Sequence, residues 1–204
     1  HRQVPVIVGA ASPTNYAETV VEVQRMVRWT ITEPREKVQH YLKLCLDERL
    51  AALDFYRDVA RANGCEFFCI FGGARTWGPR QLQQFGDVDR IFLDKARQIF
   101  PYVLWHHCGH NLPQALQNLA DWPGLKAVQY DMPYHSQKLT WPEFYESVAK
   151  LFAGRRCAMN APTTQVACYG TPDDVRRMVR EFIDSTRPHT TAVVMPGCEI
   201  DSFA

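Results

Sequence analysis

The chain has 204 residues, 46% of them hydrophobic and 22% charged, a composition typical of a soluble globular protein with a sizeable core. Lys and Arg number 23, Asp and Glu number 22, and no basic block occurs, so nothing indicates binding to nucleic acid or to an anionic membrane. The apolar runs are too short to span a bilayer, and seven scattered cysteines are more typical of a reducing compartment than of a disulfide framework. We therefore predict a cytoplasmic protein.

Short apolar runs alternate with amphipathic stretches from one end of the chain to the other. Most runs are rich in Val, Ile, Phe or Tyr and are bounded by turn-forming residues, which is the pattern of a buried strand. The predicted strands cover residues 4–10, 65–71, 101–108, 125–131, 155–160 and 190–195.

The stretches between the predicted strands have helical spacing. Val20, Val23 and Val27 are predicted to share one helix face, and residues 33–63 keep the spacing until "NG" ends the helix. Asn111 is expected to open a helix after the third strand.

Two later helices carry explicit start signals. Thr140 with Glu143 has the spacing of a capping box, and Thr171 with Asp174 repeats it. A proline in the first turn follows each threonine. These signals predict helices over residues 140–154 and 171–187.

The order of the elements predicts an α/β fold. Strands alternating with single helices favour a parallel sheet, as in a (β/α) barrel or a doubly wound sheet. Polar residues follow the ends of several strands, as in the active site of a TIM-type barrel, and no G-x-G-x-x-G follows the first strand. We predict one domain, residues 1–204, forming about six of the eight units of a parallel TIM-type barrel. The first strands and the last helix are then expected to be missing, and the rest of the barrel or another subunit is expected to cover the open edges.

The segment "WHHCGHN", residues 105–111, concentrates potential metal ligands at the end of the third strand. In a strand, His106 and Cys108 face one side and His107 faces the other. A histidine and a thiolate are only part of a zinc site, which needs at least three protein ligands. Cys198 also follows a strand, next to a glycine, and is the best candidate for the third. The fourth position would then be open to a substrate thiol or another exchangeable group.

A structural role is the alternative for each of these residues. A lone cysteine at a strand end is more often a small buried hydrophobic residue than a ligand. We assign that role to the other five cysteines, which are Cys45, Cys65, Cys69, Cys157 and Cys168. For His106, Cys108 and Cys198, their expected position at one rim favours a metal site.

Other polar residues at the same rim are candidates for catalysis or support. Asp131 is an acid–base group, a hydrogen-bond partner of a ligand, or a loop cap, and the sequence does not distinguish these roles. Glu199 either orients a ligand or occupies the fourth zinc position, with an ordinary surface residue as the alternative. His107 and His110 are structural residues or supports for a ligand.

Taken together, these motifs resemble a known family. "HHCGHN", followed ninety residues later by "MPGCEID", resembles the H-x-C-G and G-C-E-I elements of the uroporphyrinogen decarboxylase-like superfamily, closest to its zinc methyltransferase branch. "YGTPDDVRRMVREFID" is similar to the family helix that begins with GTPE, and the resemblance extends over nearly the whole chain.

The resemblance implies a TIM-type barrel and a specific reaction. Members of this branch transfer a methyl group, with zinc, between a corrinoid carried on a partner protein and an acceptor such as coenzyme M or tetrahydrofolate. It implies that His106, Cys108 and Cys198 bind Zn²⁺, and we expect Asp131 and Glu199 at the same rim to be the catalytic residues. We expect His110, Asn111 and Asn160 to contact the cofactor or a pterin acceptor.

Two rival functions remain at this stage. A tetrapyrrole decarboxylase of the same superfamily needs no metal, and Arg75 and Asp131 are the residues that the chain offers for it. True decarboxylases usually have Gly-His-Gly where this chain has Gly197, Cys198 and Glu199, so the cysteine favours methyl transfer. A barrel that has lost its activity and serves as a binding module is the second rival.

Overall fold

The computed structural model describes residues 8–74, 76–107, 112–122, 124–130, 139–160 and 164–195. Within them, the side chains of residues 112–115, 157–160 and 164–165 are not described.

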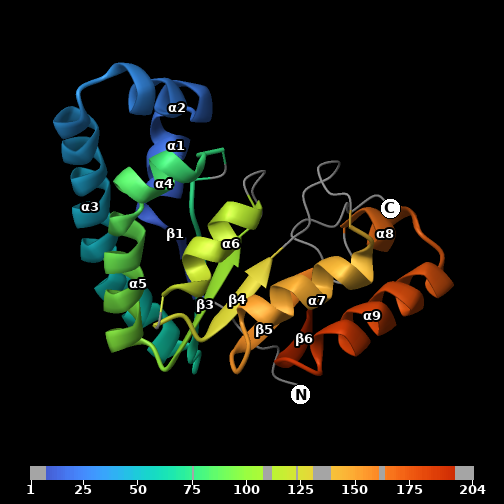
Figure 1. Ribbon diagram of the computed structural model, residues 1–204. Coiled ribbons are helices and arrows are strands. Elements are labelled where there is room, and N and C mark those ends of the chain that lie inside the picture. The colour runs from blue at the N-terminus through green and yellow to red at the C-terminus, as the bar shows by residue number, and fades with distance from the viewer. Residues whose placement is uncertain are drawn as a thin grey trace.

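The described strands form one parallel sheet whose strand order follows the chain (Figure 1). Every neighbouring pair is parallel, so each connection crosses from the end of one strand back to the start of the next. This order confirms the predicted parallel α/β sheet and is compatible with a TIM-type barrel. The strands are β1 (Val8–Ala11), β2 (Phe67–Phe71), β3 (Tyr102–His107), β4 (Ala127–Tyr130), β5 (Arg156–Asn160) and β6 (Thr191–Met195).

Helices fill the connections between the strands. The longest, α3, precedes β2, and the segment between β2 and β3 forms two helices, α4 and α5. The helices are α1 (Pro13–Val21), α2 (Val23–Thr32), α3 (Arg35–Ala62), α4 (Pro79–Phe85), α5 (Asp87–Ile99), α6 (Leu112–Ala120), α7 (Trp141–Leu151), α8 (Thr164–Tyr169) and α9 (Pro172–Thr186). None of these described helices combines the length and the hydropathy that crossing a membrane requires.

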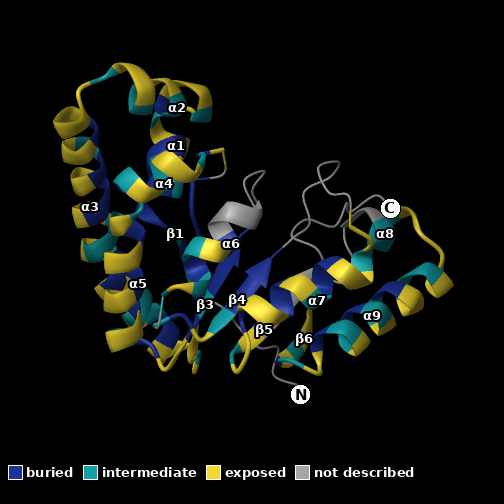
Figure 2. Ribbon diagram, viewed as in Figure 1, coloured by how far each residue is buried: buried dark blue, intermediate teal, exposed yellow. Residues whose placement is uncertain are grey.

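The main core lies between the helices and one face of the sheet. Alternate strand residues such as Phe68, Trp105 and Val128 are buried in a single cluster with side chains from α3, α5, α6, α7 and α9 (Figure 2). The intervening residues of β2 and β3 face the other way, and Phe67 and Tyr102 there are 48% and 44% exposed. The three long helices predicted from the sequence therefore cover the same face, which excludes a doubly wound sheet for the described strands.

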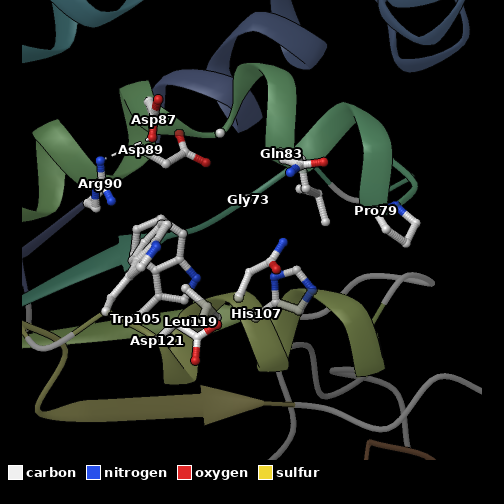
Figure 3. Close-up of a pocket in the computed structure, with 14 residues that line it drawn as sticks. Gly73, Pro79, Gln83, Asp87, Asp89, Arg90, Trp105, His107, Leu119 and Asp121 are labelled. Atoms are coloured by element: carbon white, nitrogen blue, oxygen red, sulfur yellow. Dashed lines mark ion pairs between the residues drawn. The ribbon is translucent and has the colours of Figure 1, made fainter.

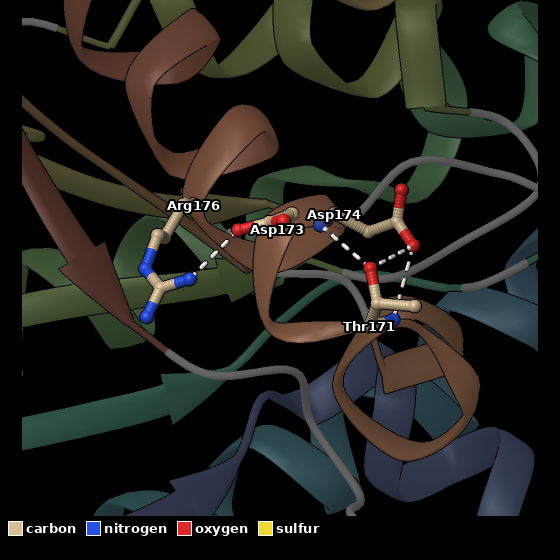
Figure 4. A network of polar contacts seen from close by, with 4 residues as sticks. All are labelled: Thr171, Asp173, Asp174 and Arg176. Carbon is tan, nitrogen blue, oxygen red and sulfur yellow. Dashed lines mark hydrogen bonds and ion pairs between the residues drawn. The ribbon is translucent and has the colours of Figure 1, made fainter.

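The predicted capping boxes are present. The backbone N–H of Thr140 donates to Glu143 Oε2 at 2.8 Å at the start of α7. At the start of α9, the Thr171 hydroxyl donates to Asp174 Oδ2 at 2.7 Å and accepts from the Asp174 N–H at 3.2 Å (Figure 4). These bonds satisfy N–H groups that lack a partner within the helix, and so fix where each helix starts.

The N-terminal helical region differs from the prediction. Val20, Val23 and Val27 do not share one buried face, since the helix breaks at Glu22, which has a φ of 70°, and Val20 is 55% exposed. Ala17 and Met26 are buried instead, in a second cluster that joins α1, α2, α3 and α4. The Val-rich pattern was misleading because it spans two helices with different axes.

Candidate functional site

His106 occupies the end of β3, on the face of the sheet that none of the described helices covers. The register pairs it with Phe71 of β2 on one side and with Gln129 of β4 on the other. Its imidazole is 5% exposed, and Nδ1 lies 3.0 Å from Oε1 of Gln129, which is also buried. The ring is therefore oriented by a neighbouring strand as well as by its own.

The contact with Gln129 sets the tautomer of His106. An amide oxygen can only accept a hydrogen bond, so Nδ1 must be the protonated nitrogen of the neutral imidazole. Nε2 then carries the lone pair. Metal-binding histidines almost always donate their other ring N–H in this way, so the His106 side chain fits the role of a zinc ligand.

An aromatic ring borders His106 on the side opposite Gln129. Phe71 meets the imidazole edge-on, with ring centroids 5.8 Å apart and planes at 73°. Gly9 of β1 makes room for this ring, because a Cβ on Gly9 would lie 2.9 Å from Phe71 Cε2. Phe71 therefore limits access of water to one side of the imidazole.

His107 faces the opposite side of the sheet, as the strand period predicts. It is 1% exposed, and Nδ1 lies 3.2 Å from the carbonyl oxygen of Gly72. Gly73 stands against the same ring with a φ of 78°, and a Cβ there would lie 3.1 Å from Nδ1. His107 is thus packed among the loop after β2 and cannot share a ligand with His106.

Most of the other predicted site residues lie outside the described residues. These are Arg75, Cys108, His110, Asn111, Asp131, Cys198 and Glu199. Asn160 ends β5, where its backbone is in register with Met195 of β6, and its side chain is not described. Among the residues that are described, no three His, Cys, Asp or Glu side chains come together as metal ligands. The three-ligand zinc site therefore stays a prediction, of which the structure describes only His106.

The described cysteines include two that are deeply packed. Burial raises the pKa of the Cys69 thiol to about 12 and also raises that of Cys45. A thiol with a raised pKa is a poor nucleophile and a poor metal ligand. Both residues therefore suit the packing role that the sequence analysis assigned to them.

The sequence analysis did not identify two polar side chains that the structure buries in hydrogen bonds. Gln129 is a polar residue within an otherwise apolar strand, and this interruption was a usable signal of a special role. Asp89 is the other: it is 3% exposed on α5, and it accepts from the Thr14 N–H at 3.0 Å and the Thr14 hydroxyl at 2.6 Å. Burial raises the pKa of Asp89 to about 6, although these hydrogen bonds oppose the shift.

Comparison with known proteins identifies a similar fold. A methyltransferase from Methanosarcina mazei superposes on 98% of this chain with a TM-score of 0.70 and 19% sequence identity. The chain spans 54% of that protein, about half of its length. At this identity the likeness establishes the fold: a parallel α/β sheet with its helices on one face.

The other comparisons add little. An amidohydrolase from Burkholderia ambifaria, solved with bound zinc, matches 91% of this chain and 57% of its own at 14% identity, but its TM-score of 0.45 is too low to support an argument. No protein-family model matches the sequence, and no curated protein matches it.

Proposed function

We propose that this chain is part of a zinc-dependent methyltransferase that moves a methyl group between a protein-bound corrinoid and a thiol or tetrahydrofolate acceptor. The observation that carries the proposal is the Gln129–His106 contact, which leaves Nε2 of a buried histidine as the lone-pair nitrogen at the C-terminal end of a strand. Active sites of (β/α) barrels lie at this end of the strands. The H-x-C-G and G-C-E-I elements and the fold shared with a methyltransferase support it.

The proposal includes a TIM-type barrel. Its interior would be the face of the sheet without helices, where Phe67 and Tyr102 stack at 5.0 Å and remain partly exposed. Further strands, from the rest of the protein or from another subunit, would close the barrel over this face. The chain's coverage of about half of the similar methyltransferase is consistent with such additional strands.

In this proposal His106, Cys108 and Cys198 hold the zinc ion. A zinc ion bound by them would lower the pKa of a coordinated acceptor thiol. Two further side chains would prepare His106 for this role. Gln129 keeps the proton on Nδ1 of His106, and Phe71 shields the ring from water.

The remaining rim residues would handle the substrates. Asp131 and Glu199 would orient the acceptor or exchange a proton with it, and Asn160, His110 and Asn111 would contact the corrinoid or a pterin ring. A corrinoid is too large for a closed pocket, so the mouth of the barrel would dock a corrinoid protein.

Metal analysis tests the proposal most directly. Protein purified in metal-free buffer and reconstituted with zinc should retain about one zinc per chain, since a catalytic zinc uses three protein ligands. Cys198→Ser should lose most of this zinc and all methyl transfer from methylcobamide to coenzyme M or tetrahydrofolate. Cys168→Ser is the matched control, because Cys168 lies on α8 and is assigned to packing.

Two results would overturn the proposal. A wild-type protein that binds no zinc would favour the decarboxylase or the binding module. A Cys198→Ser variant that keeps its full zinc content would show that the three-ligand site is wrong. If zinc binds but neither acceptor is methylated, the proposed metal site is supported and the proposed methyl transfer is wrong.

A further inference from the structure

Cavities on the two sides of the sheet differ in charge. The one on the helix-covered side, of about 410 Å³, has aspartates in its wall (Figure 3). The other, of about 520 Å³, lies where β2 to β5 begin, and Arg97, Lys126 and Arg156 line it. None of the described residues that line this second cavity, here called the basal groove, is acidic. The basal groove is therefore suited to an anion, and its volume is within the range of small-molecule binding sites.

The strand register places the floor of the basal groove on the face that none of the described helices covers. Arg156 is in register with Ala127, and Ala127 is in register with Leu104. Leu104 and Ala127 come two positions before His106 and Gln129 on the same strands, so they share a face with them. The basal groove is thus one layer of side chains below the candidate metal site and distinct from it.

The floor of the basal groove is apolar. Phe67 and Tyr102 stack there, with ring centroids 5.0 Å apart and planes at 24°, and both rings remain about half exposed. Leu104 and Val193 extend the apolar surface. An inorganic anion would leave this surface in water. An anion with an apolar body would cover it, and burying apolar area is worth about 25 cal/mol per Å².

Two of the three cations have no competing partner. Lys126 and Arg156 are exposed and form no ion pair within the described part of the chain. The backbone N–H of Arg156 donates to the Lys126 carbonyl oxygen at 2.9 Å, so the two residues are adjacent at the start of neighbouring strands. Arg97 contacts Asp94 at 3.9 Å, a long ion pair between two exposed side chains. A carboxylate at this end of the groove would therefore meet a positive charge that no carboxylate of the described chain neutralises.

Protein segments are less suitable occupants of the charged end. An isologous contact between two copies of this chain over the groove would bring the cations of both copies together, and like charges at an interface are unfavourable. Strands that closed a barrel would cover the floor beside Phe67. Arg97 and Lys126 instead belong to α5 and to the turn before β4, so the groove would still open between these connections.

We propose that the basal groove binds an amphipathic carboxylate, a molecule with an unbranched apolar chain and one anionic end. The carboxylate lies beside Lys126 and Arg156, and the apolar chain lies along Tyr102 and Leu104. This site does not depend on zinc or on the proposed methyl transfer.

Decanoate is a suitable probe, and 1-decanol is the neutral molecule with the same chain. The fluorescent dye 1-anilinonaphthalene-8-sulfonate, itself an apolar anion, reports whether the groove is occupied. Titration of the full chain with the dye should show saturable binding. Decanoate should displace the dye at about one-tenth of the concentration that decanol needs, because only decanoate meets the cations. Added salt should weaken the binding of decanoate and leave that of decanol unchanged.

A matched pair of arginine variants locates the site. Arg156→Gln should weaken decanoate binding about fivefold, which corresponds to about 1 kcal/mol, and should not change decanol binding. Arg180→Gln is the control, because Arg180 is exposed on α9 and does not line the groove. It should bind decanoate as the wild type does.

Three results would each overturn the proposal. They are equal displacement of the dye by decanoate and decanol, equal effects of the two variants, and an affinity for decanoate that does not change with salt. The salt series uses the unmodified chain, so the proposal can fail even if Arg156→Gln does not fold. Zinc content should be the same with and without decanoate, so these results are independent of the metal site.

Discussion

The two faces of the sheet differ in how they are packed, although their residues alternate along the same strands. On one face, Phe68 stacks on Phe100 at 4.3 Å within a core to which helices contribute along the length of the sheet. On the other, Phe67 stacks on Tyr102 and stays about half exposed. The five-residue strand β2 therefore contributes one side to a well-packed core and the other side to an exposed apolar surface. We infer that most of the folding stability comes from the helix-covered face. The other face, here called the bare face because none of the described helices covers it, is left to bind a ligand or to pack against further strands.

The largest expected effect comes from comparing alanine variants of two adjacent phenylalanines, one on each face. Phe68→Ala should lower the free energy of unfolding by about 3–5 kcal/mol, because it removes a fully buried ring and leaves a cavity. Phe67→Ala should cost less than about 1 kcal/mol in the chain alone, because its ring is already half in solvent. Urea unfolding followed by circular dichroism measures both. Similar losses for the two variants would mean that the bare face is packed in solution, by self-association or by a partner.

The buried carboxylate of Asp89 gives the helix side a specific pH dependence. Burial raises its pKa from 3.8 to about 6, so between these values the folded chain binds more protons than the unfolded chain. The free energy of unfolding should therefore fall as pH rises from 4 to 6, with a contribution from Asp89 of up to about 3 kcal/mol. Asp89→Asn should remove this contribution and flatten the profile. Asp87→Asn, on the exposed side of the same helix, should follow the wild type.

Variants of Gln129 test whether the bare face holds a metal site. Gln129→Leu should weaken zinc binding about 10–100-fold, because it removes the acceptor that orients His106. Gln129→Glu should bind zinc more tightly than Gln129→Leu, because a carboxylate also accepts from Nδ1. Competition with a zinc chelator measures the affinities, and the unfolding midpoint of each variant in the absence of metal controls for stability. Equal affinities for the two variants would show that Gln129 does not act through the histidine.

Much of the fold could be predicted because its signals are local. Thr140 with Glu143 and Thr171 with Asp174 define helix starts within four residues, and the apolar runs mark six strands in an order that the sheet confirms. The break at Glu22 was missed because a positive φ at a glutamate has no marker in the sequence. The second core cluster was missed for a related reason: it joins four helices whose relative positions depend on that break.

The candidate site could be predicted less well, because it depends on contacts between distant segments. The alternation of His106 and His107 follows from strand period alone and is seen. That Gln129 would meet His106 depends on the register between β3 and β4, which the sequence of either strand does not define. The same holds for Asp89, whose partner Thr14 is 75 residues away.

Because His106 and His107 are adjacent and face opposite sides of the sheet, β3 cannot readily tolerate an insertion or deletion of one residue. A deletion of one residue between Tyr102 and Trp105 would shift the strand by one position and exchange the faces of every later side chain. His107 would then take the place beside Gln129, and Trp105 would leave its position against Gly72. We therefore expect insertions and deletions to be tolerated in the loops on either side of β3 and not within the strand, which expression of folded one-residue deletion variants would test.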